Sequence, residues 1–264
     1  DGSLVGFILA RVWGRVGWFG TFGVPTQFQR LGIGTALVNR TVDCLRGMAD
    51  VVGLETMPES GTNISLYSRA GFVATYPTLV MELSLIREAD SLKGVGPDEV
   101  TSLASLDEAS RTQLKAEVRT LCDALTPGLD YTPEIDAMET NGIGQTLFSC
   151  GAGGRLDGFA VLRTAPFRRD DKSGRGYIHV MGIRPGAPTV GVLNDLLRQV
   201  WTTATQRGLS RLTTGLSSRN QAAVKLMLDA GFRGIRAAIR MVHLPVTPEL
   251  FQPTDAFDVA RWVG

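Results

Sequence analysis

The chain of 264 residues is 44% hydrophobic and 20% charged, with a formal net charge of +1 at pH 7. This composition is typical of a globular protein with one large or two medium domains. It gives no overall reason to expect nucleic acid or a membrane surface as a partner, and no apolar run approaches the ~20 residues of a membrane span. Three widely spaced cysteines argue against a disulfide framework and favour a cytoplasmic location. Two histidines without a Cys-x-x-Cys pair indicate no metal site.

The first third of the chain predicts a small α/β unit. The spacing of apolar residues indicates strands over 4–12 and 18–24, a helix over 33–48, a strand over 51–56, a short helix over 64–69 and strands within 72–85. Gly71 fits the end of the short helix. The charged segment 87–99, which contains two glycines and a proline, is predicted to be a linker.

The rest of the chain predicts a larger unit with more helix. Helices are expected over 107–125, 133–140, 190–207 and 220–229, and strands over 145–150, 158–164, 176–183, 211–216 and 235–244. The proline-containing segment from Pro245 is predicted to be irregular. We therefore expect domains at 1–86 and 100–244, joined by the linker 87–99 and followed by a tail at 245–264.

Three short stretches of the first unit are echoed in the second, in the same order. Residues 4–7 parallel 156–159, residues 24–37 parallel 183–196 at an offset of 159, and residues 66–72 parallel 226–232 at an offset of 160. Any one of these echoes could arise by chance, but three in order indicate two copies of one α/β unit.

A glycine-containing turn between the second strand and the first helix is the main candidate site. The first turn of a helix leaves main-chain N–H groups without partners and carries partial positive charge, so it can bind phosphate. Gly32 and Gly34 lack a Cβ, so an anion can approach the main chain, and Arg30 could add a charge. On the glycines alone, a plain strand-to-helix connection, in which glycine only relieves backbone strain, is the favoured interpretation. A dinucleotide fingerprint would need a glycine where the chain has Leu37.

The surrounding residues resemble one protein family. The run Gln29-Arg30-Leu31-Gly32-Ile33-Gly34 matches the Q/R-x-x-G-x-G/A signature of the GNAT superfamily of N-acetyltransferases, and residues 66–72 resemble its L-Y-x-x-x-G-F segment. The resemblance implies an α/β fold of the α+β type, with two tandem GNAT-like domains and a central mixed β-sheet flanked by helices. It implies acetyl-CoA as the cofactor and a small-molecule primary amine as the acceptor. The implied cofactor-binding residues are Phe22, Gly23, Val24, Gln29, Arg30, Leu31, Gly32, Ile33, Gly34, Thr35 and Asn63.

The resemblance also implies catalytic roles. Tyr67, with a phenol pKa of about 10 against roughly 8.5 for a thiol, would act as the general acid that protonates the leaving thiolate. It could instead be a core aromatic residue. The family often has a glutamate base on the strand before the phosphate turn, but residues 18–24 contain no acid. Glu55, on the next strand, is therefore the candidate general base, and it could as easily be a surface carboxylate or a salt-bridge partner.

The second copy keeps the fold signals and loses the chemistry. Pro188, Leu193 and Met227 stand where the first copy has Gln29, Gly34 and Tyr67, so cofactor binding is expected in the first copy. This arrangement is loosely similar to that of the mycothiol synthase family, but here the intact copy is N-terminal. The first copy also lacks the leading strand and helices. Those residues either lie outside the chain or are replaced by the partner domain.

Two classes of function remain open from the sequence. The first is an N-acetyltransferase acting on a small amine, as a monomer or homodimer, without nucleic acid or membrane partners. The alternative is a non-catalytic CoA-binding sensor or scaffold module. A protein-modifying transferase stays open as a variant of the first class.

Overall fold

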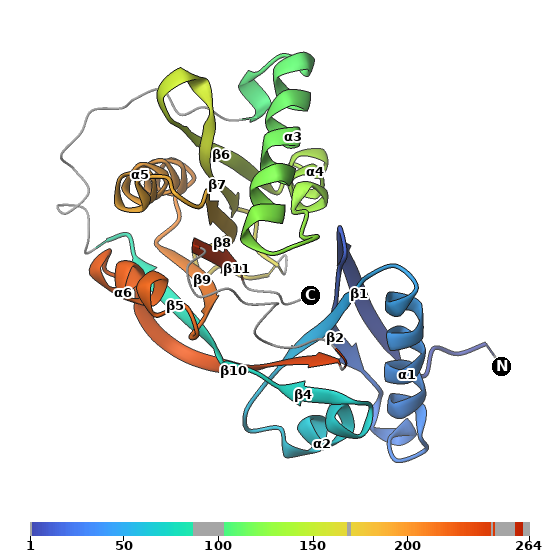
Figure 1. Cartoon of the computed structure of the whole chain (residues 1–264). Helices are drawn as coiled ribbons and strands as arrows, with labels where there is room; N and C mark the ends of the chain where they lie inside the picture. Colours follow the sequence, from blue (N-terminus) through green and yellow to red (C-terminus); the bar gives the residue numbers. More distant parts are fainter. Residues whose placement is uncertain (1, 87–102, 168–169, 244, 246–256, 261–264) are drawn as a thin grey trace.

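The structure, a computed structural model, describes residues 2–86, 103–167, 170–243, 245 and 257–260 (Figure 1). The predicted linker at 87–99 lies outside these residues. The first unit contains β1 (Phe7–Trp13), β2 (Val16–Gly23), α1 (Ile33–Arg46), β3 (Val51–Thr56), α2 (Gly61–Arg69), β4 (Phe72–Ala74) and β5 (Thr78–Ser84). Gly71, with φ of +90°, ends α2 in the left-handed conformation, as its position in the sequence predicts.

The second unit begins with two helices. Its elements are α3 (Glu108–Leu125), α4 (Thr132–Thr140), β6 (Gly144–Cys150), β7 (Leu156–Arg163), β8 (Arg175–Ile183), α5 (Thr189–Gln206), β9 (Arg211–Ser217), α6 (Gln221–Asp229), β10 (Arg233–His243) and β11 (Phe257–Ala260). Two helices begin at side-chain caps. The Asp107 carboxylate accepts from the Ser110 N–H at 2.8 Å, and the Asn220 side chain accepts from the Ala223 N–H at 2.9 Å.

All eleven strands belong to one mixed sheet, which confirms the predicted fold class. The main order is β1-β2-β3-β10-β5-β9-β8-β7-β6, with β4 beside β10 and β11 beside β8. Parallel pairing occurs between β2 and β3 and between β8 and β9, which are equivalent positions in the two units. Other pairs are antiparallel, as expected for two copies of one topology.

The two units exchange their last strands. In the first unit, the chain turns between β4 and β5, whereas the equivalent residues of the second unit continue as the single long strand β10 (Figure 1). The second half of β10 pairs with β3 and β4 of the first unit. In return, β5 pairs with β9 of the second unit and with the first half of β10. Each unit therefore completes the sheet of the other.

Helices cover both faces of this sheet and divide the core into three clusters. Helices α5 and α6 pack on one face of the second unit's strands, and α1 and α2 pack against β2, β3, β4 and β10. Helices α3 and α4 form a cluster with β6, β7 and β8 that also contains Trp13, Val16 and Trp18 of the first unit. The helix pair of the second unit thus also packs against the first unit's hairpin.

The predicted elements agree with the structure within a few residues, except in the tail. The segment after Pro245 was expected to be irregular, but Phe257–Ala260 forms β11, which pairs with β8. Three of its four residues are buried, because Phe257, Val259 and Ala260 face the core. Within the described parts of the chain, no helix combines the length and hydropathy needed to cross a membrane.

Candidate active site

A cavity opens where the two parallel strands of the first unit separate. Pairing between β2 and β3 ends at Phe19 and Leu54, although both strands continue beyond that point. The cavity between them has a volume of about 210 Å³. Its lining residues come from β2, β3, α2 and the exchanged strands β5 and β10. They are Phe19, Gly20, Thr21, Phe22, Glu55, Thr56, Met57, Asn63, Tyr67, Val80, Arg236 and Ala238.

A β-bulge in β2 lies at the wall of this cavity, which Gly20, Thr21 and Phe22 line. The register of the β1–β2 hairpin shifts so that Ile8 faces Phe22 while Leu9 faces Gly20, and Thr21 is the extra residue of the bulge. Thr21 has φ of +53°, a conformation that non-glycine residues rarely adopt. The bulge begins just after Phe19, the last residue of β2 that pairs with β3. Nothing in the sequence Gly20-Thr21-Phe22 indicated it.

The predicted phosphate turn presents unpaired main-chain amides. The Gln29 side chain donates to the Val24 carbonyl oxygen at 3.0 Å and so closes the loop before the turn. Arg30 and Gly32 then take φ values of +64° and +81°. The first main-chain bond after the turn runs from the Ala36 N–H to the Gly32 carbonyl at 3.0 Å, and no N–H of residues 30–35 donates to a main-chain acceptor among the described residues.

The two glycines of the turn serve different purposes. A Cβ added to Gly32 would meet no atom within 4 Å, so the approach to its amide is open, and the positive φ accounts for the glycine. A Cβ added to Gly34 would lie 3.1 Å from the Phe22 ring, which itself lines the cavity. A side chain at residue 34 would therefore displace a wall of the cavity. The donor set of amides at a helix N-terminus fits a diphosphate.

Tyr67, near the C-terminal end of α2, lines the cavity. Its side chain is buried and makes edge-to-face contacts with Phe19 and Phe72, at ring-centroid distances of 6.0 and 6.3 Å. Burial raises the pKa of the Tyr67 hydroxyl above its ordinary value, because the phenolate would lose hydration. The hydroxyl is therefore protonated at neutral pH, as an acid must be.

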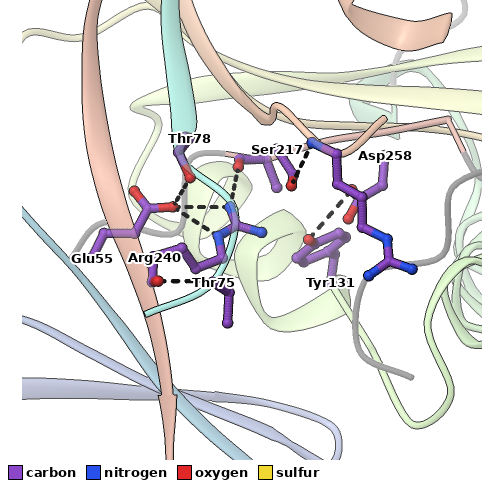
Figure 2. Close-up of polar contacts among 9 residues, drawn as sticks. Glu55, Thr75, Thr78, Tyr131, Ser217, Arg240 and Asp258 are labelled. Atoms are coloured by element: carbon purple, nitrogen blue, oxygen red, sulfur yellow. Dashed lines mark hydrogen bonds and ion pairs between the residues drawn. The ribbon is translucent and has the colours of Figure 1, made fainter. Parts of the chain in front are cut away.

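Glu55 lines the same cavity but is held in a buried ion pair (Figure 2). Its Oε1 accepts from the Thr78 hydroxyl at 2.5 Å and from Nε and Nη2 of Arg240 at 3.1 and 2.9 Å. The side chains of Glu55 and Arg240 are only 2% and 4% exposed. The other oxygen, Oε2, is buried and accepts no hydrogen bond from the described residues. Only Oε2 is free to receive a proton.

The structure brings some of the predicted site residues together in the cavity and places the others in the turn. Phe22, Glu55, Asn63 and Tyr67 share the cavity, whereas residues 29–35 form the turn at the entrance of α1. Gly23 packs against Phe7: a Cβ there would lie 3.0 Å from its ring. Sequence reasoning missed Val80, Arg236 and Ala238, which reach the cavity through the strand exchange and carry no motif.

The second unit has no equivalent turn. Helix α5 begins at Thr189, three residues before the position that corresponds to the start of α1, so helix replaces the turn. Leu193 and Met227, at the positions of Gly34 and Tyr67, are buried in the core. Gly191, at the position of Gly32, lies within the helix and is exposed. The difference between the copies is therefore structural as well as chemical.

Part of the chain matches a known protein family. Residues 1–72 match the Acetyltransferase (GNAT) family, which covers the hairpin, the turn and the Tyr67 segment. The family match covers only this part of the chain, and the fold of the chain as a whole is similar to that of solved tandem GNAT structures. No curated protein sequence is significantly similar to it.

Three solved structures are similar over most of the chain. An acetyltransferase from Pyrococcus horikoshii has a TM-score of 0.65 at 18% identity, and the match covers 98% of this chain and 75% of that one. A tandem GNAT protein from the clavulanic acid biosynthesis pathway has a TM-score of 0.60 at 14% identity, with coverage of 91% and 79%. A GCN5-related N-acetyltransferase from Sphaerobacter thermophilus has a TM-score of 0.56 at 16% identity, with coverage of 92% and 77%. At these identities the likeness concerns the fold.

Proposed function

We propose that the protein is an acetyl-CoA-dependent N-acetyltransferase that acts on a primary amine of a small molecule, with its active site in the first unit. The observation that carries this proposal is that three features occur together in the first unit. Open amides lie at the start of α1, the parallel strands β2 and β3 separate to form a cavity, and the buried side chain of Tyr67 lines that cavity. In the second unit the parallel strands β8 and β9 also stop pairing before they end, but helix replaces the turn, Met227 stands in place of Tyr67, and β11 pairs with β8 beyond that point.

The residues of the turn would hold the diphosphate of the cofactor. Main-chain N–H groups of residues 30–35 are unpaired donors, and the helix dipole of α1 adds partial positive charge. The cavity between β2 and β3, with Asn63 on one wall, would receive the pantetheine arm. The bound thioester supplies the activated acetyl group.

Tyr67 would provide the proton that the thiolate leaving group needs. Its raised pKa keeps the hydroxyl protonated, and its contacts with Phe19 and Phe72 fix the ring. Positioned proton transfer of this kind contributes roughly 10²- to 10⁴-fold to rate.

A base must remove a proton from the ammonium form of the acceptor before attack. The role of Glu55 as this base stays a prediction. Its Oε1 is fully occupied by Thr78 and Arg240, so a proton would have to be taken by Oε2, directly or through water.

The competing proposal is a non-catalytic CoA-binding module, and one experiment separates the two. Release of free CoA from acetyl-CoA is measured with a panel of small amines, beside calorimetric titration of acetyl-CoA. Amine-dependent release that falls at least about 100-fold in Tyr67→Phe, with binding unchanged, supports the transferase. Tight binding with no turnover on any amine supports the module.

A further inference from the structure

A second, larger cavity lies between the two units. It has a volume of about 390 Å³ and is walled by β1 of the first unit and by α4, β7 and β8 of the second. It shares no lining residue with the cavity at Tyr67. A volume of this size is typical of sites for small organic molecules. We call it the inter-unit cavity.

The carboxylate of this cavity is fully occupied. Glu134 of α4 is buried, and its Oε1 accepts from Nη1 of Arg11 at 2.9 Å and from the Trp13 indole N–H at 2.8 Å. Its Oε2 lies 3.0 Å from Nε2 of His179. Glu134 therefore neutralises Arg11 and has no further oxygen directed at another cation.

A second guanidinium faces the cavity without a counter-charge. Arg163, at the end of β7, forms no ion pair with any carboxylate among the residues that the structure describes. Burial lowers the pKa of Arg163 below its ordinary value, and the nearby charge of Arg11 lowers it further. The cavity thus has two guanidinium groups and one carboxylate, an excess of positive charge.

Arg163 is held in one orientation by groups that do not neutralise it. Its Nε donates to the Ala165 carbonyl at 3.0 Å and its Nη2 to the Pro166 carbonyl at 3.2 Å. The guanidinium also lies 4.3 Å from the ring centroid of Phe167, a cation–π geometry. A fixed, planar guanidinium favours ligands with matching planar acceptors, above all carboxylates.

The remaining walls are largely apolar. Met138, Ile143 and Phe167 line the cavity beside Val12 of β1. A strongly hydrated ion such as phosphate would gain little from such walls, whereas the hydrocarbon part of an organic acid would be removed from water there.

We propose that the inter-unit cavity binds a small organic carboxylate, with its charged group against Arg11 and Arg163 and its apolar body against Met138, Ile143 and Phe167. Because β1 and the second unit both contribute residues, the ligand bridges the two units. The site is independent of the acetyl-CoA site proposed above.

The test uses the full chain and three probes in calorimetric titrations. The probes are 3-phenylpropionate, its neutral analogue 3-phenylpropanamide, and inorganic phosphate. We expect saturable one-site binding of the carboxylate and at least about tenfold weaker binding of the amide and of phosphate. Equal binding of the carboxylate and the amide, preference for phosphate, or no saturable binding of any probe would each overturn the proposal.

Variants then identify the groups responsible. Arg163→Gln and Arg11→Gln should each weaken carboxylate binding at least about tenfold, whereas Arg207→Gln, at an exposed arginine after α5, should leave it unchanged. Unchanged affinity in both cavity variants overturns the proposal. Arg11 has a 41% exposed side chain, so its variant still gives an answer if Arg163→Gln does not fold.

Methionine methyl NMR locates the ligand while both arginines of the cavity are kept. Met138 lines the inter-unit cavity and Met57 lines the cavity at Tyr67, so the two residues report on different sites. With 3-phenylpropionate, the ε-methyl signal of Met138, assigned by its loss in Met138→Leu, should shift while that of Met57 stays in place. A shift confined to Met57 would contradict the proposed location.

Discussion

Arg240 on β10 and Glu55 on β3 lie 185 positions apart in the chain, yet two nitrogens of Arg240 donate to one oxygen of Glu55 (Figure 2). Arg240 also donates to the Ala260 carbonyl of β11 at 3.3 Å and lies 5.6 Å from the ring centroid of Trp18. One buried cation therefore connects the first unit's sheet, the exchanged strand and the strand from the tail. Its partner carboxylate lines the proposed active site.

Removing the cation alone should be strongly destabilising. Arg240→Met leaves the Glu55 carboxylate buried without a counter-charge, which costs about 3–5 kcal/mol of the free energy of unfolding. Urea denaturation at pH 7 measures this loss. The double variant Arg240→Met with Glu55→Gln should recover a substantial part of it, because residue 55 then no longer carries a buried charge without a partner.

The matched control is an exposed ion pair. Lys225→Met breaks the pair between Lys225 and Asp229 on α6, whose side chains are 75% and 59% exposed, and should cost less than about 1 kcal/mol. If Arg240→Met costs no more than Lys225→Met, the buried pair does not hold the exchanged strand in place.

Equivalent glycines of the two copies should respond to alanine in opposite directions. Gly32 has φ of +81° with open space around it, so Gly32→Ala should lower the free energy of unfolding by about 1–2 kcal/mol through backbone strain alone. Gly191 lies in α5 with no atom within 4 Å of an added Cβ, so Gly191→Ala should raise it by about 0.5–1 kcal/mol. Thermal and urea unfolding measure both, and changes of the same sign would show that the copies have not diverged at this turn.

The sequence predicts the elements of this fold well because their signals are local. Apolar spacing, the glycine after α2 and the turn at Gly32 each depend on neighbouring residues, and the structure places all of them where expected. The repeat of the two units was also readable, since it requires only comparison of the chain with itself.

Features that depend on distant parts of the chain could not be read in this way. The pairing of Glu55 with Arg240, and the arrival of Arg236 in the cavity, follow from the exchange of β5 and β10. Strand order depends on pairing across the whole sheet. The alternation of apolar residues in each unit's last strand would be the same whether that strand paired with its own unit or with the other. β11 was missed because a strand of four residues, Phe257–Ala260, is too short to give a clear periodic signal after the prolines of the tail.

A bulky side chain at Gly34 should disable the proposed cofactor site. A leucine there copies Leu193 of the second unit and would push against the Phe22 ring, which is 3.1 Å from the position of a Cβ at residue 34. We expect Gly34→Leu to weaken acetyl-CoA binding at least about tenfold in calorimetry. Gly191→Leu, on the exposed start of α5, is the control and should bind normally. Unchanged affinity in folded Gly34→Leu would show that the cofactor does not use this turn.

The cluster around Glu134 should make stability depend on pH in the acid range. Burial by itself would raise the pKa of Glu134, but the hydrogen bond and charge of His179, the charge of Arg11 and the hydrogen bond from Trp13 lower it to about 2. The folded state therefore binds fewer protons than the unfolded state between the ordinary value of 4.5 and about 2. The contribution is fully present above pH 4.5 and is lost as the pH falls toward 2, at most about 3 kcal/mol in all.

Glu134→Gln removes this titration while it keeps the shape of the side chain. The difference in unfolding free energy between the wild type and Glu134→Gln should therefore shrink steadily when urea unfolding is measured at pH 5, 4 and 3. Glu59→Gln, at an exposed carboxylate, gives the baseline. A difference that stays constant from pH 5 to pH 3 would mean that Arg11, Trp13 and His179 do not hold Glu134 in its charged form. The net charge given above for the inter-unit cavity, which counts Glu134 as a charged carboxylate, would then be wrong.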